Sequence, residues 1–450
     1  MGGKWPVVRL GDHADLCLGK MLDKEKNRGE FFPYLGNKSV RWGSFDTENL
    51  AQMRFEKHEH ERYELKYGDL VVCEGGEPGR CAIWKDEIPG MKIQKALHRI
   101  RPHKGLDNIF LHYWFLWSGN NGSLEQFFTG TTIKHLTGKA VAALEVPLPP
   151  FPEQKAIAHI LGSLDDKIQL NRQMNATLEA MAQALFKSWF VDFDPVIDKA
   201  LAAGNPIPEP LRKRAEARRT LGDKRKPLPV DITQHFPDRF VFNEEMGWVP
   251  EGWKESTVGT EFNITMGQSP PGNTYNEHGE GIPFFQGRTD FGFRYPTNRI
   301  YCTAPKRFAS KGDSLVSVRA PVGDVNMAAL DCCVGRGVSA LRHKSGSQSF
   351  TYYSMLQLRE HFNVYEGEGT VFGSINQKDF KSLPQTVVLF DLVSKFDTYA
   401  GKIDEKIEFN TKNIYSLTSL RDTLLPKLLS GKLRIPDAEK LIGETAQPPR

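Results

Sequence analysis

The sequence repeats part of itself at a fixed distance, and this repeat limits the possible folds more than any other feature. Residues 164–171 (LDDKIQLN) match residues 403–410 (IDEKIEFN), 239 positions later, and residues 130–133 (GTTI) match residues 369–372 (GTVF) at the same offset. Nearer the start of each half the distance between matching residues changes. Residues 68–71 (GDLV), for example, correspond to residues 312–316 (GDSLV). We infer a duplicated unit in which a variable first part is followed by a last part that keeps its register.

The part that keeps its register has the pattern of a long helix. Mostly apolar side chains recur at alternating steps of three and four, as in a helix that packs along one narrow stripe. The pattern predicts long helices at residues 151–194 and 391–431 that pack on each other, with Asn171 and Asn410 as polar residues that fix the register of the seam. Packing of each helix on its own globular domain is the alternative. The stripes are positions 161, 164, 168, 171, 175, 178, 182, 185 and 189, and positions 400, 403, 407, 410, 414, 417, 421, 424 and 428.

The remaining sequence divides into two globular domains and two accessory segments. Residues 1–150 and 251–390 contain short apolar runs bounded by turn residues, such as 69–72 (DLVV) and 314–318 (SLVSV). These runs predict short strands with a few helices in each half. Residues 195–250 form a proline-rich connector with a basic run, and residues 432–450 form a tail. The expected fold class is therefore α+β, with two similar mixed domains joined by two long helices.

The sequence has no convincing set of catalytic or metal-binding residues. The six cysteines form no Cys-x-x-Cys pair, and His58 and His60 lie in a charged run that favours a solvated surface over a metal site. Asp165 and Asp404 fall within the predicted helices, where surface pairs one turn away account for them. There is also no serine elbow and no Asn/Asp-Pro-Pro-aromatic run that could hold a flipped base for methyl transfer. We expect a chain that is not an enzyme by itself, with no catalytic residue, no metal and no bound cofactor.

No apolar run approaches the roughly 18 residues that a membrane-spanning helix needs, and the first residues lack a secretory signal. We therefore expect a cytoplasmic protein without a membrane partner.

Basic and amide side chains in glycine-containing loops point to DNA as a partner. Arginine recognises guanine, asparagine and glutamine recognise adenine, and lysine and arginine neutralise phosphates. The net charge of +4 permits such a partner without requiring one. Two similar but divergent domains suit a target made of two unlike half-sites. The candidate DNA-binding residues are Lys38, Arg41, Arg80, Lys134 and His135 in the first domain, and Gln286, Arg288, Arg294, Arg319, Asn376, Gln377 and Lys378 in the second.

Several longer stretches resemble one known family. Residues 146–154 (VPLPPFPEQ) lead into residues 157–161 (IAHIL), the first predicted helix ends in residues 186–195 (FKSWFVDFDP), and residues 424–431 (LLPKLLSG) close the second. Together they resemble the specificity (S) subunit of Type I restriction-modification systems over nearly the whole chain. The second half departs from this pattern, because residues 384–387 (PQTV) replace the Pro-Leu-Pro-Pro opening.

The resemblance implies both an architecture and a role. The two long helices would run antiparallel as a coiled coil and act as a ruler, while each domain would be a target recognition domain that reads one half of a bipartite, asymmetric site in double-stranded DNA. Partners would be two modification (methyltransferase) subunits, which use S-adenosylmethionine to methylate adenine, and restriction/translocase subunits, with ATP and Mg²⁺ also on the partner subunits. A two-lobed scaffold or adaptor that assembles proteins through its coiled coil without touching DNA is the alternative, and a self-contained modification enzyme is a third.

Overall fold

The computed structural model describes residues 5–23, 27–103, 105–224, 227–365 and 373–445 of the 450-residue chain. The chain forms two compact units, one of residues 1–172 with 411–450 and the other of residues 173–410. Residues 369–372, which carry one of the repeat matches, lie outside the described residues. Within the described ranges, no helix is both long and apolar enough to cross a membrane.

The first unit contains a lobe of short strands and helices, which we call the first lobe. Its elements are β1 (Val7–Arg9), β2 (Ala14–Leu18), β3 (Glu30–Leu35), β4 (Val40–Arg41), β5 (Ser44–Phe45), β6 (Gln52–Phe55), α1 (His60–Tyr63), β7 (Leu70–Cys73), β8 (Cys81–Ile83), β9 (Lys92–Ile93), β10 (Leu97–Pro102), α2 (Asn108–Asn120), α3 (Gly138–Ala143) and β11 (Glu145–Pro147). A four-stranded antiparallel sheet has the order β2-β10-β7-β8, and a smaller sheet has the order β6-β3-β9 with β3 parallel to β9. Strands β1 and β11 pair and so bring the two ends of the lobe together.

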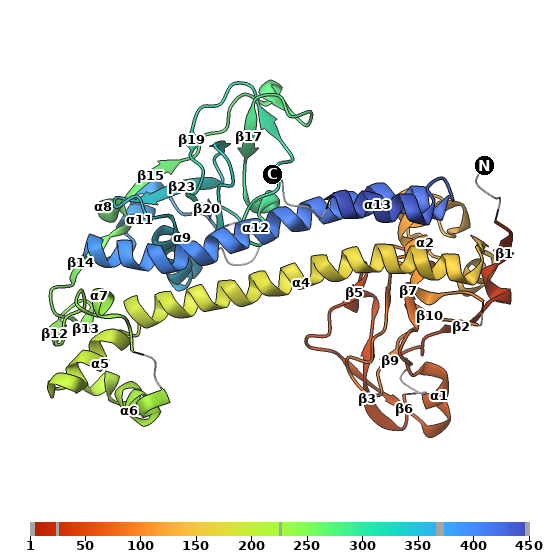
Figure 1. Cartoon of the computed structure of the whole chain (residues 1–450), viewed down its shortest axis with the longest axis horizontal. Helices are drawn as coiled ribbons and strands as arrows, with labels where there is room; N and C mark the ends of the chain where they lie inside the picture. Colours follow the sequence, from red (N-terminus) through yellow and green to blue (C-terminus); the bar gives the residue numbers. More distant parts are fainter. Residues whose placement is uncertain (1–4, 24–26, 104, 225–226, 366–372, 446–450) are drawn as a thin grey trace. The chain divides into compact units, whose positions relative to one another are not determined.

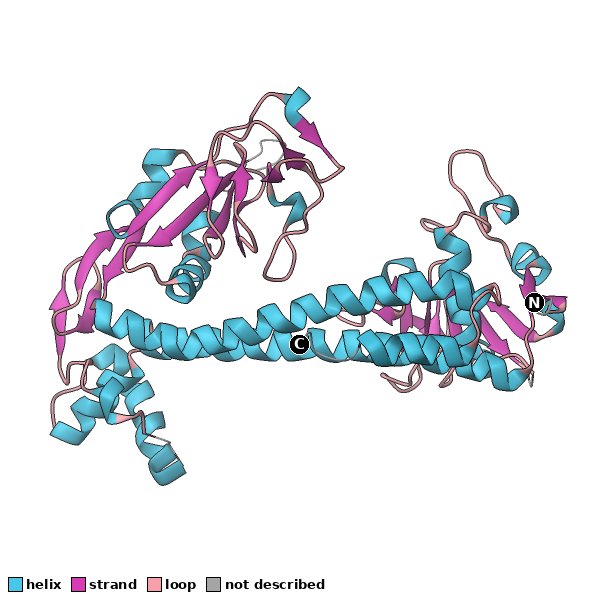
Figure 2. Ribbon diagram, turned by 45° about the horizontal axis from the view of Figure 1, so that its top comes forward, coloured by secondary structure: helices cyan, strands magenta, loops and turns pink. Residues whose placement is uncertain are grey.

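The second unit contains a second lobe, in which the same arrangement returns. Its elements are β14 (Lys254–Thr257), α8 (Val258–Glu261), β15 (Phe262–Met266), β16 (Tyr275–Asn276), β17 (Ile282–Phe285), β18 (Tyr301–Cys302), β19 (Phe308–Ala309), β20 (Ser314–Val318), β21 (Val322–Met327), β22 (Cys332–Val334), β23 (Val338–His343), α9 (Gln348–Gln357), α10 (Arg359–Asn363), α11 (Gln377–Ser382) and β24 (Pro384–Val387). The order β15-β23-β20-β21 reproduces β2-β10-β7-β8, the pair β14-β24 reproduces β1-β11, and β17 is parallel to β22 as β3 is to β9. Figure 2 shows each lobe as a mixed unit of strands and helices. The predicted duplication and α+β class are confirmed.

Two helices of 40 residues each, α4 (Phe151–Phe190) and α12 (Phe390–Leu429), are the longest elements of the chain (Figure 1). In the first unit, Leu161 near the start of α4 shares a core with Leu424 near the end of α12. In the second unit, Phe186 near the end of α4 shares a core with Phe396 near the start of α12. The helices therefore pack on each other in antiparallel fashion, as predicted. The alternative is also partly correct, because Tyr113 Oη of the first lobe donates a hydrogen bond of 2.6 Å to Asp165 on α4, the helix that follows this lobe.

The seam between the helices contains a buried polar pair. Asn410 Nδ2 donates a hydrogen bond of 2.9 Å to Asn175 Oδ1, and both side chains are buried. The prediction named Asn171 together with Asn410, but Asn171 is only half-buried. The physical reason is the antiparallel direction of the helices, since residues at equivalent positions of the two repeats lie at different levels along the seam. Asn175, already one of the stripe positions, is the partner that the antiparallel register selects.

The stretch predicted as a connector contains regular structure. Its elements are α5 (Asp194–Ala203), α6 (Arg212–Leu221), α7 (Val230–Thr233) and a hairpin of β12 (Phe240–Asn243) with β13 (Gly247–Pro250), and the tail contains α13 (Ile435–Thr445). Arg214 donates to Asp194 through Nε (2.7 Å) and Nη2 (2.8 Å), and Arg218 Nε donates to Asp198 (2.6 Å). Part of the positive charge of the basic run is therefore neutralised within the connector. The predicted domain boundaries stay a prediction.

The core of the first lobe contains a histidine whose charge state should change stability. His112 on α2 is buried with its Nδ1 3.4 Å from Cys81 Sγ, and burial lowers the pKa of His112 to about 4. Asp165 opposes this shift, while Arg421 and Lys85 add to it.

We therefore expect acid to weaken the fold through His112. Because the folded pKa lies below the unfolded value of about 6.5, the unfolded state takes up a proton first as the pH falls. Stability that is complete above pH 6.5 should decrease by about 3 kcal/mol by pH 4. Urea unfolding of the wild type and His112→Gln across this range measures the effect as the difference between the two curves. Parallel curves would contradict it.

Candidate nucleic-acid interface

Three loops of the first lobe carry four of the five candidate residues of that lobe, and the fifth, Arg41, lies in β4 directly after the first loop. The first loop follows β3 and contains the short 3-10 helix Asn37–Ser39, the second joins β7 to β8 (residues 74–80), and the third precedes α3 (residues 129–137). Arg80 Nη2 donates to Asn37 O (3.0 Å), so the first two loops are in contact. A β-bridge between Gly75 and His135 joins the second loop to the third.

Local sequence explains how these loops hold their shape. Gly76 has φ +73°, and a Cβ there would come within 2.6 Å of Asn37 Nδ2, so the close approach of the first two loops requires glycine. The third loop ends where the Thr137 side chain accepts a hydrogen bond from Ala140 N (3.3 Å) and caps α3. Loops tied down in this way present their side chains in a fixed arrangement.

The charges on these loops differ in their partners. Arg80 Nη1 contacts Glu77 at 2.9 Å and Arg41 Nη2 contacts Asp46 at 3.3 Å, whereas Lys38, Lys134 and His135 are exposed. A pocket of about 530 Å³ lies between the second and third loops and includes Gly76 and Lys134 in its lining. The surface therefore combines oriented guanidinium groups with exposed basic side chains next to a recess.

The second lobe places its candidates on the three equivalent loops and at the start of α11, and all but one of them are exposed. Gln286 and Arg288 follow β17, with Arg288 opening the 3-10 helix Arg288–Asp290, and Arg319 lies between β20 and β21. The third loop precedes α11, and the N-cap Asn376 and the first two helical residues, Gln377 and Lys378, are exposed. Asn376 Oδ1 accepts from Asp379 N (2.9 Å) and caps α11, as Thr137 caps α3.

Backbone contacts join these loops as in the first lobe. A β-bridge connects Arg319 with Ser374, matching the bridge between Gly75 and His135. Gly337 N donates to Gln286 O (3.0 Å) and Val318 N donates to Gly337 O (2.9 Å), which links the first loop to the strand that leads into the second. The sequence singled out these residues one by one, and the shared topology brings them together within each lobe.

Arg294 is the exception. Its guanidinium is fully buried and contacts Glu179 of α4 and Asp404 of α12 (2.9 Å from Nη1 to Oδ1). A side chain enclosed in this way has no face left for a base or a phosphate. The structure therefore contradicts the prediction that Arg294 contacts DNA.

Sequence reasoning also missed the role of two carboxylates at equivalent positions of the repeat. Asp165 accepts from Tyr113 Oη (2.6 Å) and Arg421 Nη1 (2.6 Å), and Asp404 accepts from Tyr353 Oη (3.1 Å) as well as from Arg294. They are not surface pairs one turn apart, as predicted, but the points at which each lobe docks on the long helices. Their shared offset of 239 was the available signal.

The described part of the chain contains no group of three or more histidine, cysteine, aspartate or glutamate residues placed to hold a metal ion. Two lobes of one topology, each with basic and amide side chains gathered on three loops and each docked on paired helices, define a duplicated, modular binding protein.

Comparison with known proteins shows which family this chain is similar to. Residues 2–180 match the family described as the Type I restriction modification DNA specificity domain. A protein of Methanocaldococcus jannaschii, provisionally named the MjaX specificity subunit of a type I restriction enzyme, is 27% identical over 449 residues, which cover 96% of this chain and 94% of that protein. The type I restriction enzyme HindI specificity subunit of Haemophilus influenzae is 26% identical over 411 residues, 82% of this chain and 87% of that protein.

A solved structure has the same fold. The crystal structure of the S subunit of a Type-I restriction-modification system from M. genitalium aligns with a TM-score of 0.54 at 19% identity, covering 94% of this chain and 96% of that chain. Over most of its length the chain is thus similar to specificity subunits of type I restriction enzymes.

Proposed function

We propose that this chain is the DNA-recognition subunit of a type I restriction-modification complex and that the three loops of each lobe read one half of a bipartite, asymmetric site. The observation that carries the proposal is the return of the same three joined loops in both lobes, with different exposed side chains on each. Lys38, Arg41 and Lys134 suit phosphate contacts, whereas Gln286, Arg288 and Asn376 suit base edges. Identical scaffolds with different side chains fit a target whose two halves differ.

The chemistry of modification and cleavage would belong to other subunits. Like the specificity subunits that it resembles, the chain would not be catalytic itself, and it would direct two methyltransferase subunits that carry S-adenosylmethionine and methylate adenine. Restriction subunits with ATP and Mg²⁺ would join the same assembly in the cytoplasm. The similarity to specificity subunits disfavours a scaffold that never touches DNA, and the salt dependence of DNA binding separates the two functions.

Removing charge from the first-lobe loops is expected to flatten the salt dependence of DNA binding. Each phosphate contact that is lost lowers the slope of log K against log salt by about 0.9. The double variant Lys38→Gln, Lys134→Gln, assembled with its modification subunits, should therefore lose up to about two units of slope while it keeps the same preferred sequence. Titration of duplex DNA at several salt concentrations measures this slope.

Lys66→Gln is the matched control, because Lys66 is an exposed lysine of the same lobe that precedes β7, at the end of this strand opposite the second loop. It should leave the slope unchanged. An unchanged slope in the double variant would remove these loops from the interface. A wild-type complex that binds DNA with no salt dependence would favour the scaffold.

A further inference from the structure

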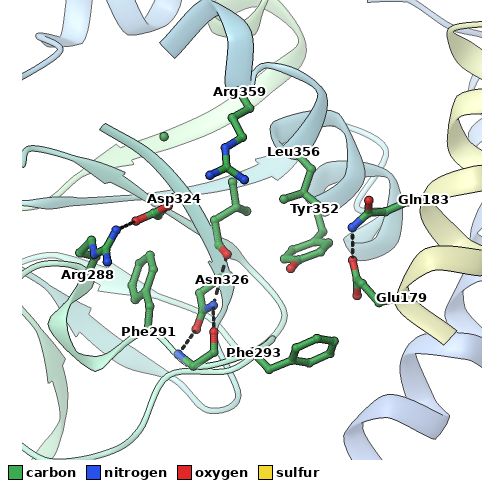
Figure 3. A pocket seen from close by; sticks show the side chains of 13 residues that line it. Glu179, Gln183, Arg288, Phe291, Phe293, Asp324, Asn326, Tyr352, Leu356 and Arg359 are labelled. Atoms are coloured by element: carbon green, nitrogen blue, oxygen red, sulfur yellow. Dashed lines mark hydrogen bonds and ion pairs between the residues drawn. The ribbon is translucent and has the colours of Figure 1, made fainter. Parts of the chain in front are cut away.

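Arg294 lies on the same loop as two candidate base-reading residues. The loop between β17 and β18 begins with Gln286 and Arg288 on the exposed surface and then runs inward to Arg294. Figure 3 shows Arg288 beside Asp324 at one side of a pocket of about 390 Å³, with Phe293 and Glu179 at the other side. One short loop therefore connects the proposed reading surface with the long helices.

The inner end of this loop is anchored on three helices at once. The Arg294 guanidinium donates to Glu179 of α4 (3.1 Å from Nε), to Asp404 of α12 (2.9 Å) and to Tyr353 Oη of α9 (2.6 Å). Its carbon Cζ also lies 4.0 Å from the centre of the Tyr352 ring. A planar guanidinium can satisfy several acceptors in fixed directions, so this contact defines both the position and the orientation of the loop end.

The segment between the surface and the anchor is braced along its length. Asn326 holds Gly292 by accepting from its N (3.2 Å) and donating to its O (2.9 Å), and Met327 N donates to Arg294 O (2.8 Å). Asp290, two residues after Arg288, accepts from Arg299 Nε (2.9 Å). These contacts hold residues 288–294 on β21, where Arg288 also pairs with Asp324, so a displacement of Arg294 should reach Arg288 through this shared strand.

In the first half of the chain, the equivalent carboxylate Asp165 is neutralised without an arginine from a lobe loop. There, the guanidinium for Asp165 comes from Arg421, which is part of α12 itself. The position equivalent to Arg421 in the other repeat is Ala182, a buried residue of α4 that is too short to reach Asp404. The arginine for Asp404 therefore comes from the second lobe. The second lobe is therefore anchored to the long helices by an arginine of its own loop, whereas the arginine at Asp165 belongs to α12.

We propose that Arg294 is a positioning residue for the second recognition surface: it ties the loop that carries Gln286 and Arg288 to α4 and α12, and so sets where these side chains meet DNA. The inference rests on the proposed function, since it assumes that this loop reads bases. Arg294 itself touches no DNA. Its effect on sequence preference passes through the braced loop.

The test asks whether Arg294 acts by positioning the loop or only by neutralising the buried carboxylate of Asp404. Arg294→Met removes the anchor, and Arg294→Met combined with Ala182→Arg supplies a guanidinium to Asp404 from α4, as Arg421 does for Asp165. Each variant is assembled with its modification subunits, its thermal stability is measured, and its preferred sites are selected from a library in which both half-sites vary.

We expect Arg294→Met to lower stability and to weaken the preference at one half-site by about tenfold, on the scale of one lost bidentate base contact. The double variant should recover stability but not this preference, and the other half-site should be unaffected in both. Arg421→Met is the control, because it removes the equivalent charge without touching a lobe loop: it should lower stability and leave both half-site preferences unchanged.

Two outcomes would overturn the proposal: recovery of the half-site preference in the double variant, or a folded Arg294→Met complex with unaltered preferences. Should Arg294→Met fail to fold, Arg294→Lys decides the question, because lysine keeps the charge but cannot hold three acceptors with one planar group. It should weaken the same half-site, and unaltered preferences would again overturn the proposal. A wild-type complex without any sequence preference would instead refute the proposed function.

Discussion

Exchange of residues 5–150 for the matching lobe of a relative is expected to change one half of the recognised DNA sequence and to leave the other half unchanged. The reason is that the first-lobe loops are joined to one another, while the second lobe carries its own set of joined loops. Each mismatched base pair costs about 1–3 kcal/mol. A half-site altered at three base pairs should therefore bind the original sequence at least about a hundredfold more weakly.

The structure defines the donor lobe that this experiment needs. It must supply a tyrosine at the position of Tyr113, because Asp165 on α4 accepts its hydroxyl, and an apolar helix at the position of α2 to cover Leu161. Mapping of methylated adenines in cells that carry the chimeric complex reads out both half-sites at once. The reciprocal exchange of residues 251–390 is the control and should alter the opposite half-site. A change in both halves after either exchange would show that the lobes do not read independently.

Lengthening both long helices by one heptad should select a DNA site with a longer gap between its halves. A heptad adds about 10 Å to a helix at 1.5 Å per residue, which corresponds to roughly three base pairs. Insertion after Arg172 in α4 and after Asn410 in α12 adds the same length on both sides of the seam and keeps Asn175 opposite Asn410. The heptad pattern of the seam is preserved.

The decisive measurement is selection from a library in which only the gap length varies. Three base pairs are about a third of a helical turn, so overall affinity should fall even where the preferred gap shifts. The matched control carries the heptad in α4 alone, which leaves the seam in register on only one side of the insertion and should destabilise the fold. A folded double insertion with the original preferred gap would show that the helices do not set the separation of the half-sites.

The sequence was informative where a periodic pattern extended over many residues. The stripe from position 161 to position 189 predicted α4, and its copy predicted α12, because one apolar face per helix leaves few other solutions. The seam partner of Asn410 could not be read in this way. In an antiparallel helix pair, the numbers of facing residues have a constant sum, whereas the repeat relates residues by a constant difference. The spacing of Asn171 and Asn175 does not show whether the helices run parallel or antiparallel.

The candidate interface was predictable only as separate residues. Arg80 and Lys134 lie on different loops, and their proximity depends on the β-bridge between Gly75 and His135, which local propensity does not encode. Arg294 was misassigned because an arginine in a glycine-rich loop has the same local sequence whether it faces solvent or a buried carboxylate. Its buried setting includes Glu179, more than a hundred residues earlier in the chain.

The ion pairs of the connector bear on how the protein searches for its target. Arg214 and Arg218 belong to the most basic segment of the sequence, yet Asp194 and Asp198 hold their guanidinium groups. Attraction to DNA of any sequence grows with the number of cations that can replace condensed counterions, and charges already engaged within the protein contribute little to it. In the proposed complex these two arginines should therefore add little to binding at incorrect sites. The length of a stay on DNA would then depend on whether the site engages the reading loops.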